Sequence, residues 1–312
     1  MSTLNYPELP SLSVWIVNYE SAIHLSACIA GLNSPAIRSI LILDNNSSDS
    51  DLQILRNVAA KDDRVHLVES STNMGFGGGH NALSNVAPEN TGDFIWILNP
   101  DMTIPEGVVD RLVQTLLLES VEIVSPVIVT GDAPQQRLWF SGGTIDVRRG
   151  QVNDALLGRD LAGLRGQPAV VSSEFISGAA PMMSRRVWDR IGGFDAKLFL
   201  YWEDVDLCLR AKALSIRMGV QTNAIIWHAE GGSSKGNRTT RTDVYFLTSR
   251  NRILVCRKSA LHGWLLIFGP GTPALLKILV HAMLREGPGR VARTFSVIRG
   301  SLAGASAPMR RP

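Results

Sequence analysis

Short apolar segments alternate with polar turns and helical segments along roughly the first 230 residues of the chain. The segments predicted as strands are rich in Val, Ile and Leu and comprise residues 12–17, 39–43, 65–69, 94–98, 123–129 and 224–228. Segments typical of helices lie between the early strands, at residues 26–32, 51–60 and 105–120. Successive strand-helix-strand units favour a right-handed parallel arrangement. The pattern therefore predicts an α/β fold with a mostly parallel central sheet.

The strand predicted at residues 94–98 ends at the motif Asn99-Pro100-Asp101. Its apolar residues are consecutive, as expected for a strand covered on both faces of a sheet. Pro100 cannot donate a hydrogen bond to a neighbouring strand, so Asp101 is left at the carboxyl end, where open α/β sheets bind ligands. An isolated Asn-Pro-Asp sequence is equally typical of a solvated turn. The interpretation therefore depends on the other motifs.

A glycine-rich segment, residues 73–81, follows the third predicted strand and precedes a short helix expected to begin near Asn81. Glycines let a backbone approach a ligand closely, and amides at a helix N-terminus favour an anion. The segment does not fit a dinucleotide-binding fingerprint, because His80 stands where the last glycine should be. A flexible turn is the alternative.

The second half of the sheet is harder to predict. Residues 130–173 are irregular, with short strands at 138–140 and 144–147, and we interpret them as an insertion that shapes a site. Small and apolar residues predict a strand at 175–183, followed by a helix near 186–191.

Three acidic side chains, Glu203, Asp204 and Asp206, lie at the start of a further predicted helix. Acids this close repel one another, although a helix N-terminus offsets part of that cost. An ordinary acid-rich first turn is therefore the alternative to a catalytic cluster. The last apolar strand ends in His228, and a single histidine in such a place is usually only a hydrogen-bonded surface residue.

Composition restricts the class of protein. The chain has 312 residues, 45% of them hydrophobic and 19% charged, enough for one large α/β domain or one and a half domains. Its three cysteines are far apart and lack Cys-x-x-Cys spacing, which suits reduced thiols and argues against a cysteine-built zinc site. No basic run followed by an apolar core precedes the first strand, so we expect no secretory signal and a cytoplasmic protein.

Charge divides the chain unequally. Residues 231–312 carry fourteen Lys and Arg against two acids, a balance of +12, which leaves −9 for residues 1–230. Anionic membrane surfaces and nucleic acids are the usual partners of such a basic region. We predict a domain at residues 1–242 and a basic, partly apolar helical region at 243–312.

The apolar segments of this C-terminal region, residues 263–269 and 274–284, are shorter than the ~20 residues needed to span a bilayer. They fit helices lying in a membrane interface, with Arg285, Arg290, Arg293 and Arg299 available to anionic lipid. An ordinary helical subdomain packed on the sheet is the alternative. We expect no nucleic acid partner, because phosphate backbones usually draw Lys and Arg with polar or stacking neighbours.

Taken together, the motifs of residues 12–230 resemble those of inverting family-2 glycosyltransferases of the GT-A fold, and most closely the bacterial rhamnosyltransferase-like branch. The matching pieces, in family order, are Val17-Asn18-Tyr19, Asp44-Asn45-Asn46-Ser47, the glycine-rich segment 73–81, Asn99-Pro100-Asp101, Gly192-Gly193-Phe194-Asp195, Glu203-Asp204-Val205-Asp206 and His228. The resemblance implies a Rossmann-like, mostly parallel sheet with helices on both faces and a C-terminal helical extension. One departure is Asn99, which replaces the first Asp of the family's usual Asp-x-Asp metal motif.

The resemblance also implies roles for particular residues. Asp204 would be the catalytic base, with Glu203 as its rival, and Asp101 with His228 would hold Mg²⁺ or Mn²⁺ against the diphosphate. The residues expected to contact nucleotide or substrate are Asn18, Asp44, Asn73, Gly77, Asn99, Asp101 and Trp202. A positioned carboxylate can take the acceptor proton, and clustered acids raise the pKa of one member.

The expected reaction transfers a sugar from a nucleoside diphosphate to a hydroxyl of a glycan or lipid-linked saccharide in bacterial cell-surface polysaccharide biosynthesis. By resemblance dTDP-rhamnose is the favoured donor, while a UDP-sugar, galactofuranose or another hexose stays open. We expect the enzyme to lie peripherally on the inner face of the cell membrane. Two other functions stay open: a sugar nucleotidyltransferase and a non-catalytic nucleotide-binding protein. The first would need a phosphate-binding loop after the first strand, and Asn18-Tyr19-Glu20 is a poor candidate for it.

Overall fold

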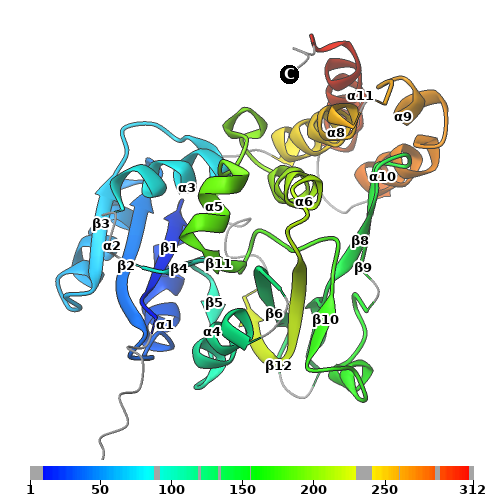
Figure 1. The fold of residues 1–312 in the computed structure, drawn as a ribbon. Helices are drawn as coiled ribbons and strands as arrows, with labels where there is room; N and C mark the ends of the chain where they lie inside the picture. The colour runs from blue at the N-terminus through cyan, green and yellow to red at the C-terminus, as the bar shows by residue number, and fades with distance from the viewer. Residues whose placement is uncertain are drawn as a thin grey trace, which may run out of the picture.

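The computed structural model describes residues 10–87, 92–118, 121–132, 135–154, 156–229, 241–259, 261–284 and 289–308. Arg285, expected to face lipid, lies outside these residues. The same expectation for Arg293 was wrong, because its side chain is buried and its Nε donates to the carbonyl of Ala282. A large sheet crosses the molecule, and the C-terminal helices stand at one end of it (Figure 1).

The N-terminal half of the sheet is parallel. Its strands are β1 (Leu12–Asn18), β2 (Ile37–Asp44), β3 (Val65–Glu69) and β4 (Phe94–Ile97), in the order β4-β1-β2-β3. All four residues of β4 are buried, as predicted for a strand covered on both faces. The register places Asn18 beside Asp44, so the polar residues that end β1 and β2 are neighbours.

The other half contains a second parallel pair, β6 (Ile123–Thr130) and β12 (Met218–His228). Strand β11 (Met182–Ser184) joins the halves, because it pairs antiparallel with both β4 and β6. The strand predicted at 175–183 was therefore too long, and strand β12 begins six residues before the predicted residue 224. The prediction of a mostly parallel sheet is confirmed.

The remaining strands are short: β5 (Met102–Thr103), β7 (Arg137–Phe140), β8 (Gly143–Asp146), β9 (Gln151–Asp154) and β10 (Val170–Ser172). Strand β7 extends the sheet beside β6, while β8 and β9 form a separate hairpin. The two short strands predicted in the irregular region are thus confirmed. Figure 1 shows the β8–β9 hairpin reaching toward the C-terminal helices.

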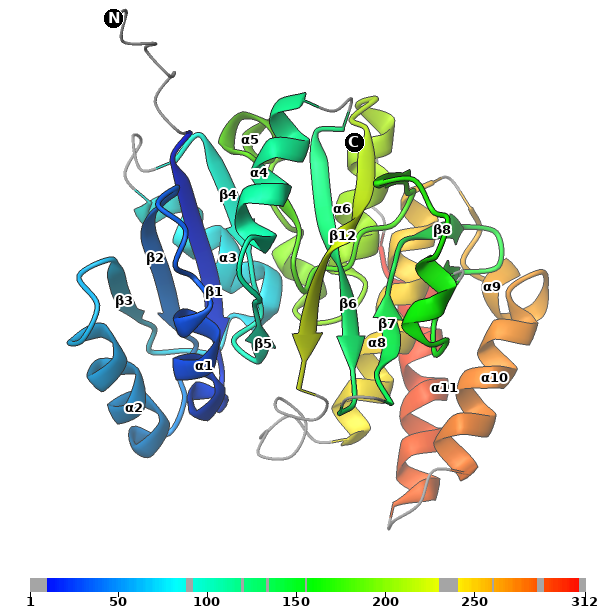
Figure 2. The same cartoon turned by 90° about the horizontal axis from the view of Figure 1, so that it is seen from below.

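Helices cover both faces of the sheet, with α1 and α4 in front and α3, α5 and α6 behind in Figure 2. Their bounds are α1 (Leu25–Ala30), α2 (Asp49–Ala59), α3 (Gly75–Val86), α4 (Val108–Leu118), α5 (Arg185–Ile191) and α6 (Glu203–Ala213). Single 3-10 turns are η1 (Ala22–His24), η2 (Leu161–Leu164) and η3 (Ala196–Leu198).

Helix α3 corrects the expectation for the glycine-rich segment. The helix begins at Gly75, not near Asn81, so the glycines lie within it. A side chain at Gly79 would place its Cβ 2.8 Å from a methyl of Val17, and one at Gly77 would lie 2.8 Å from Cβ of Phe194. Glycine is a poor helix former. Here it lets the helix approach the sheet and the turn at Phe194 closely.

The C-terminal region forms α8 (Arg241–Lys258), α9 (Leu265–Phe268), α10 (Thr272–Leu284) and α11 (Arg290–Ser306). These helices share a small core of their own, and α10 and α11 lie side by side in Figure 2. Every helix in the described part of the chain is too short or too polar to cross a bilayer. The division into domains at 242/243 stays a prediction.

Candidate active site

An aspartate and a histidine meet at the carboxyl edge of the sheet. Strand β5 pairs with the end of β12, which sets His228 opposite Met102 and therefore next to Asp101. The His228 Nε2 lies 3.2 Å from Oδ2 of Asp101. The backbone amide of Ala229 also donates to the carbonyl of Asp101. Two residues separated by more than a hundred positions thus form one polar pair, as the sequence motifs predicted.

This pair has unused capacity for a ligand. The Asp101 side chain is 3% exposed and that of His228 13% exposed. Oδ1 of Asp101 and Nδ1 of His228 are buried and accept or donate no hydrogen bond within the described part of the chain. Leaving a buried polar atom unpaired costs about 1–3 kcal/mol. A bound partner that uses these atoms would remove that cost.

A divalent cation fits the pair, provided that it takes further ligands from elsewhere. No cluster of three or more His, Cys, Asp or Glu able to hold a metal occurs among the described residues. Mg²⁺ and Mn²⁺ accept oxygen ligands and keep waters, so one carboxylate together with substrate phosphates is a usual arrangement. An imidazole ligand suits Mn²⁺ better than Mg²⁺.

The acid cluster lies close to the same edge. Asp204, in the first turn of α6, accepts hydrogen bonds from the backbone amides of Gly178 at 3.2 Å and Val205 at 2.8 Å. The next residue, Ala179, accepts from the backbone amide of Asn99 at 2.9 Å. The two-residue segment 178–179 therefore connects Asp204 directly to the Asn99-Pro100-Asp101 turn.

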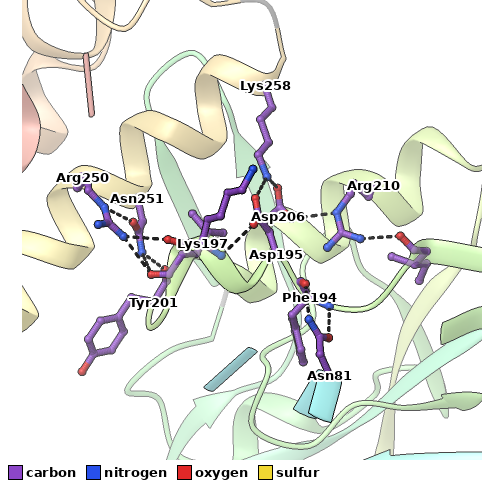
Figure 3. Close-up of polar contacts among 12 residues, drawn as sticks. Asn81, Phe194, Asp195, Lys197, Tyr201, Asp206, Arg210, Arg250, Asn251 and Lys258 are labelled. Carbon is purple, nitrogen blue, oxygen red and sulfur yellow. Dashed lines mark hydrogen bonds and ion pairs between the residues drawn. The ribbon is translucent and has the colours of Figure 1, made fainter. Parts of the chain in front are cut away.

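The three acids of α6 have different surroundings. Asp206 is buried and bonded at both oxygens, to Nε of Arg210 at 2.9 Å and to Nζ of Lys258 at 2.5 Å (Figure 3). Lys258 also binds Asp195, at 2.7 Å. Asp206 is thus engaged in holding α8 on α6. Glu203 and Asp204 are the members left for chemistry.

The pKa values of these two acids respond to burial and to hydrogen bonding. Burial raises the pKa of Glu203 well above its ordinary value, and the neighbouring charge of Asp204 adds to the effect. Burial also raises the pKa of Asp204, but hydrogen bonds from the amides of Gly178 and Val205 oppose it. Burial thus raises the pKa of both acids, and the amide hydrogen bonds to Asp204 favour its charged form.

The turn before α6 has an unusual backbone. Phe199, Tyr201 and Trp202 have φ angles of 64°, 67° and 71°, in a region that non-glycine residues rarely occupy. Asn251 of α8 is completely buried, and its Nδ2 donates to the carbonyls of Leu198, Leu200 and Tyr201 at 2.7–2.9 Å.

Arg250 adds weaker contacts to the same turn, through the carbonyls of Lys197 and Leu198 (Figure 3). A helix of the predicted C-terminal region thus fixes the turn that presents the acids. Our sequence analysis missed Asn251, Arg250 and Lys258. Nothing in the pattern of α8 distinguishes these residues from other polar positions on a helix.

Asn18 and Asp44 form the other polar corner of the edge. Both side chains are buried, and Oδ1 of each has no hydrogen-bond partner among the described residues. Nδ2 of Asn18 donates to Asp51 at 2.6 Å, and the amide of Ser47 donates to Oδ2 of Asp44 at 3.2 Å. Two oriented acceptors at adjacent strand ends can receive donors from a ligand.

Asn73 is engaged within the protein. Its Oδ1 accepts from Nδ2 of Asn45 at 3.0 Å and from the amide of Gly75 at 2.9 Å. The next amide, of Phe76, donates to the carbonyl of Phe199 at 2.8 Å, so this network also contacts the turn before α6. The sequence analysis quoted Asn45 within a motif but gave it no role, whereas in the structure its side chain organises the network. The expected substrate contacts of Asn73 and Gly77 stay predictions.

Trp202 and Asn99 complete the set of predicted residues. Trp202 is half-buried and packs against apolar residues of both the turn and the C-terminal helices. Asn99 is half-buried beside Asp101; its amide donates to the carbonyl of Ala179, and its own carbonyl accepts from the thiol of Cys28. The structure thus brings Asp101, His228, Asn99 and Asp204 to one edge, with Asn18 and Asp44 at the ends of the neighbouring strands.

Comparison with known proteins identifies the family. The model of glycosyltransferase-like family 2 matches residues 10–242, which is most of the chain. The chain belongs to glycosyltransferase-like family 2. The family predicted from the motifs is therefore confirmed, while the rhamnosyltransferase branch is a finer distinction that this match does not make.

Relatives of this family-2 chain include a hexosyltransferase and a rhamnosyltransferase. The low-salt glycan biosynthesis hexosyltransferase Agl10 of Haloferax volcanii is 26% identical over 216 residues, which cover 68% of this chain and 64% of Agl10. The N-acetylglucosaminyl-diphospho-decaprenol L-rhamnosyltransferase of Mycobacterium tuberculosis is 26% identical over 218 residues, covering 63% of this chain and 68% of that protein. The chain spans less than two thirds of the length of Agl10.

Solved structures confirm the predicted GT-A fold of this family-2 protein. The mannosyltransferase PcManGT from Pyrobaculum calidifontis, in complex with GDP-Man and Mn²⁺, superposes with a TM-score of 0.57 over 96% of this chain and 88% of that chain, at 14% identity. GalNAc-T7 with UDP, GalNAc and Mn²⁺ gives a TM-score of 0.60 over 82% of this chain and 51% of that chain, at 13% identity. Both neighbours contain Mn²⁺, one of the two cations expected here.

Proposed function

We propose that the protein is an inverting, metal-dependent glycosyltransferase that moves a hexose from a nucleoside diphosphate to an acceptor hydroxyl. The observation that carries the proposal is the connection of the Asp101–His228 pair to Asp204. The two lie at one sheet edge and are joined through the hydrogen bonds of residues 178–179. Family-2 membership supports the same reaction.

The chain's own groups can perform each part of this reaction. Asn18 and Asp44 would accept hydrogen bonds from the nucleotide, and Asp101 with His228 would hold the cation. A cation bound there would supply Lewis-acid neutralisation of the leaving diphosphate. Asp204 takes the proton of the acceptor hydroxyl as its oxygen bonds to the anomeric carbon. The bond from that carbon to the diphosphate breaks on the opposite face, which inverts the configuration.

The favoured donor is dTDP-rhamnose, and a lipid-linked saccharide is the favoured acceptor in the synthesis of a bacterial cell-surface polysaccharide. The mycobacterial relative supports both, since its name describes rhamnosyl transfer to a diphospho-decaprenol saccharide. Agl10 keeps another hexose open. A sugar nucleotidyltransferase is less well supported. Glu20, after β1, directs its carboxylate to Ser48, where a phosphate-binding loop would need amides or cations.

The test uses Asp204→Asn and, as a matched control, Asp63→Asn at an exposed surface position. Nucleotide sugars are first screened for Mn²⁺-dependent donor hydrolysis, which needs no knowledge of the acceptor. We expect Asp204→Asn to lose transfer by at least about a hundredfold while nucleotide affinity measured by calorimetry is kept. Normal transfer by Asp204→Asn would remove Asp204 from the role of base.

We further propose that the α9–α11 face attaches the enzyme to an anionic membrane, on the cytoplasmic side of the cell membrane. This face consists of exposed apolar residues, namely Leu265, Phe268, Leu276, Val280, Met283, Leu284, Val291, Phe295, Ile298 and Leu302. They recur at helical spacing on α10 and α11, which lie side by side (Figure 2). Patches of this kind mark interaction surfaces.

Charge complementarity supports an anionic membrane as the occupant of this face. Lys277, Arg290 and Arg299 are exposed on the same helices. Residues 244–284 and 289–308 contain no Asp or Glu in the sequence. An apolar face with basic flanks suits a bilayer containing anionic lipid. A protein partner would more commonly meet this surface with acidic side chains of its own.

Flotation with vesicles of phosphatidylglycerol and phosphatidylcholine tests the attachment. The variant Phe268→Glu/Leu284→Glu/Val291→Glu alters three residues that are at least 77% exposed, so its fold should be kept. The control is Ile23→Glu/Leu118→Glu, equally exposed but on α4 and η1. We expect only the first variant to stop floating. Equal flotation of both variants, or equal flotation of the wild type with purely zwitterionic vesicles, would refute the proposal.

A further inference from the structure

A cavity of about 370 Å³ lies between the turn before α6 and the C-terminal helices. Its walls come from the β8–β9 hairpin, the turn, α8 and α10, and they include Asn153, Trp202, Asp204, Thr248, Arg252 and Lys277. This volume is within the range of small-ligand sites, which combine aromatic surface with a few polar groups. The proposed catalytic base is therefore part of a cavity that the residues beyond the family match help to build.

Arg252, which lines this cavity, is a buried cation without a counter-ion among the described residues. The side chain is 1% exposed, and among the described residues its guanidinium donates to three backbone carbonyls, of Arg149, Leu266 and Gly271. Its Nε has no hydrogen-bond partner, and no carboxylate pairs with it in the described part of the chain. Burial lowers the pKa of Arg252, as expected for a cation without a counter-ion. Buried charges are normally paired, so this one can gain from an anion.

Lys277 places a second cation on the cavity, from α10. Its side chain is exposed, and no ion pair involves it among the described residues. Asp204 is the one acid among the described residues that line the cavity. The cavity therefore has a carboxylate on the wall formed by α6 and two cations on the walls formed by α8 and α10. A ligand with both a reactive hydroxyl and an anionic group matches this arrangement.

We propose that the cavity is the acceptor subsite, where Arg252 and Lys277 bind a phosphate of a phosphorylated saccharide whose hydroxyl reaches Asp204. This inference rests on the proposed glycosyl transfer and specifies its acceptor. Trp202 and Asn153 supply an apolar surface and a polar group for the sugar ring. The phosphate can belong to a lipid-linked saccharide or to a free sugar phosphate. The first source agrees with α10, which carries Lys277 beside the exposed Leu276 of the α9–α11 face.

Calorimetry on the full chain in EDTA tests the subsite, because without a cation the diphosphate site of the donor is weakened. Three probes are used: citronellyl diphosphate linked to N-acetylglucosamine, glucose 1-phosphate and methyl glucoside. We expect at least one phosphorylated probe to bind more than about tenfold tighter than methyl glucoside. Binding of the prenyl probe alone would show that the site takes a lipid-linked saccharide. Binding of both phosphorylated probes would show that the site recognises the phosphate group with or without a lipid. Equal binding of all three probes, or binding of none, overturns the proposal.

Lys277 is exposed, so the substitution Lys277→Gln leaves the core unchanged. The matched control is Lys61→Gln, at an exposed turn. Lys277→Gln should weaken the phosphorylated probe by about tenfold, whereas Lys277→Arg and Lys61→Gln should weaken it less than about threefold. Unchanged affinity in Lys277→Gln would overturn the role of Lys277 and with it the subsite. Arg252 is not substituted, because three carbonyls depend on its guanidinium.

Failure of the subsite and failure of the proposed function give different results. Metal-dependent donor hydrolysis by the wild-type protein, measured without acceptor, reports on the donor site alone. Hydrolysis without binding of any probe refutes the acceptor subsite and keeps glycosyl transfer. Absence of hydrolysis with every nucleotide sugar refutes glycosyl transfer, whatever the probes do.

Discussion

Replacing Asn251 by Ala tests how the acid-bearing helix is held. The change removes both amide N–H groups that bind the carbonyls of Leu198, Leu200 and Tyr201. Two lost hydrogen bonds amount to about 1–3 kcal/mol, and an acceptor left buried adds about 1–3 kcal/mol. Phe199, Tyr201 and Trp202 have positive φ angles, each with a strain energy of about 1–3 kcal/mol. The turn can relax and release this strain once the hydrogen bonds to Asn251 are lost.

We therefore expect Asn251→Ala to lower the free energy of unfolding by about 2–4 kcal/mol, measured by urea titration. Relaxation of the turn moves Asp204, and a displacement near 1 Å can cost about a hundredfold in kcat. The donor KM should change less than about twofold, since Asn18 and Asp44 lie on other strands. This split between kcat and KM distinguishes positioning from a general loss of fold.

Ser249→Ala is the matched control on the same helix. Ser249 is completely buried and its hydroxyl has no hydrogen-bond partner among the described residues, so its loss should change stability by less than about 1 kcal/mol. Asn251→Asp keeps the shape but turns an acceptor toward three carbonyls, and it should be at least as harmful as Asn251→Ala. A destabilised Asn251→Ala enzyme with wild-type kcat would refute the positioning argument.

Three further predictions concern the same region. Because burial raises the pKa values of Glu203 and Asp204, the folded protein binds protons more tightly, and the free energy of unfolding should fall as pH rises from about 4 through the raised values. Glu203→Gln should flatten this slope in urea titrations, and an unchanged slope would contradict the assignment. His228→Ala should raise the Mn²⁺ concentration for half-maximal donor hydrolysis by at least about tenfold; an unchanged metal titration would exclude it as a ligand. Gly75 has a φ of 73°, and a Cβ added there would clash with the carbonyl of Phe199. Gly75→Ala should therefore lower the melting temperature by several degrees. An unchanged melting temperature would show that the turn at Phe199 can move aside.

The central strands β1, β2, β4 and β6 were predictable because they are buried on both faces. Runs such as β4 contain little besides apolar residues, so their length and ends are visible in the sequence. Strand β12 was predicted too short because its first half includes Gln221 and Thr222. These polar side chains are buried and satisfied by Thr115 and by the carbonyl of Pro168. The local sequence pattern cannot predict hydrogen-bond partners that lie so far away along the chain.

Helix α3 shows a different limit. Several glycines in succession favour a loop by local propensity, and the early start of the helix was missed for that reason. The compensation is close packing against Val17 and Phe194, which becomes visible only with the fold. Tertiary contact here reverses the local preference.

The candidate site was predictable where a residue follows a strand. Asp101 and His228 meet because β5 and β12 pair, and position at a strand end was enough to suggest the encounter. Asn251 and Lys258 were not predictable, since their partners lie about fifty residues earlier and on other elements. Their role depends on how α8 packs against the turn.

The family match ends at residue 242, yet the contacts that hold the turn before α6 come from α8, which begins at Arg241 and continues to Lys258. A protein shortened to the matched segment would lose Asn251 and Lys258 together, and with them the brace behind Asp204. On the proposed function, the smallest active unit therefore includes part of the C-terminal region. Substitutions in α8 would then alter the position of Asp204 without changing any residue of the motifs quoted from the sequence.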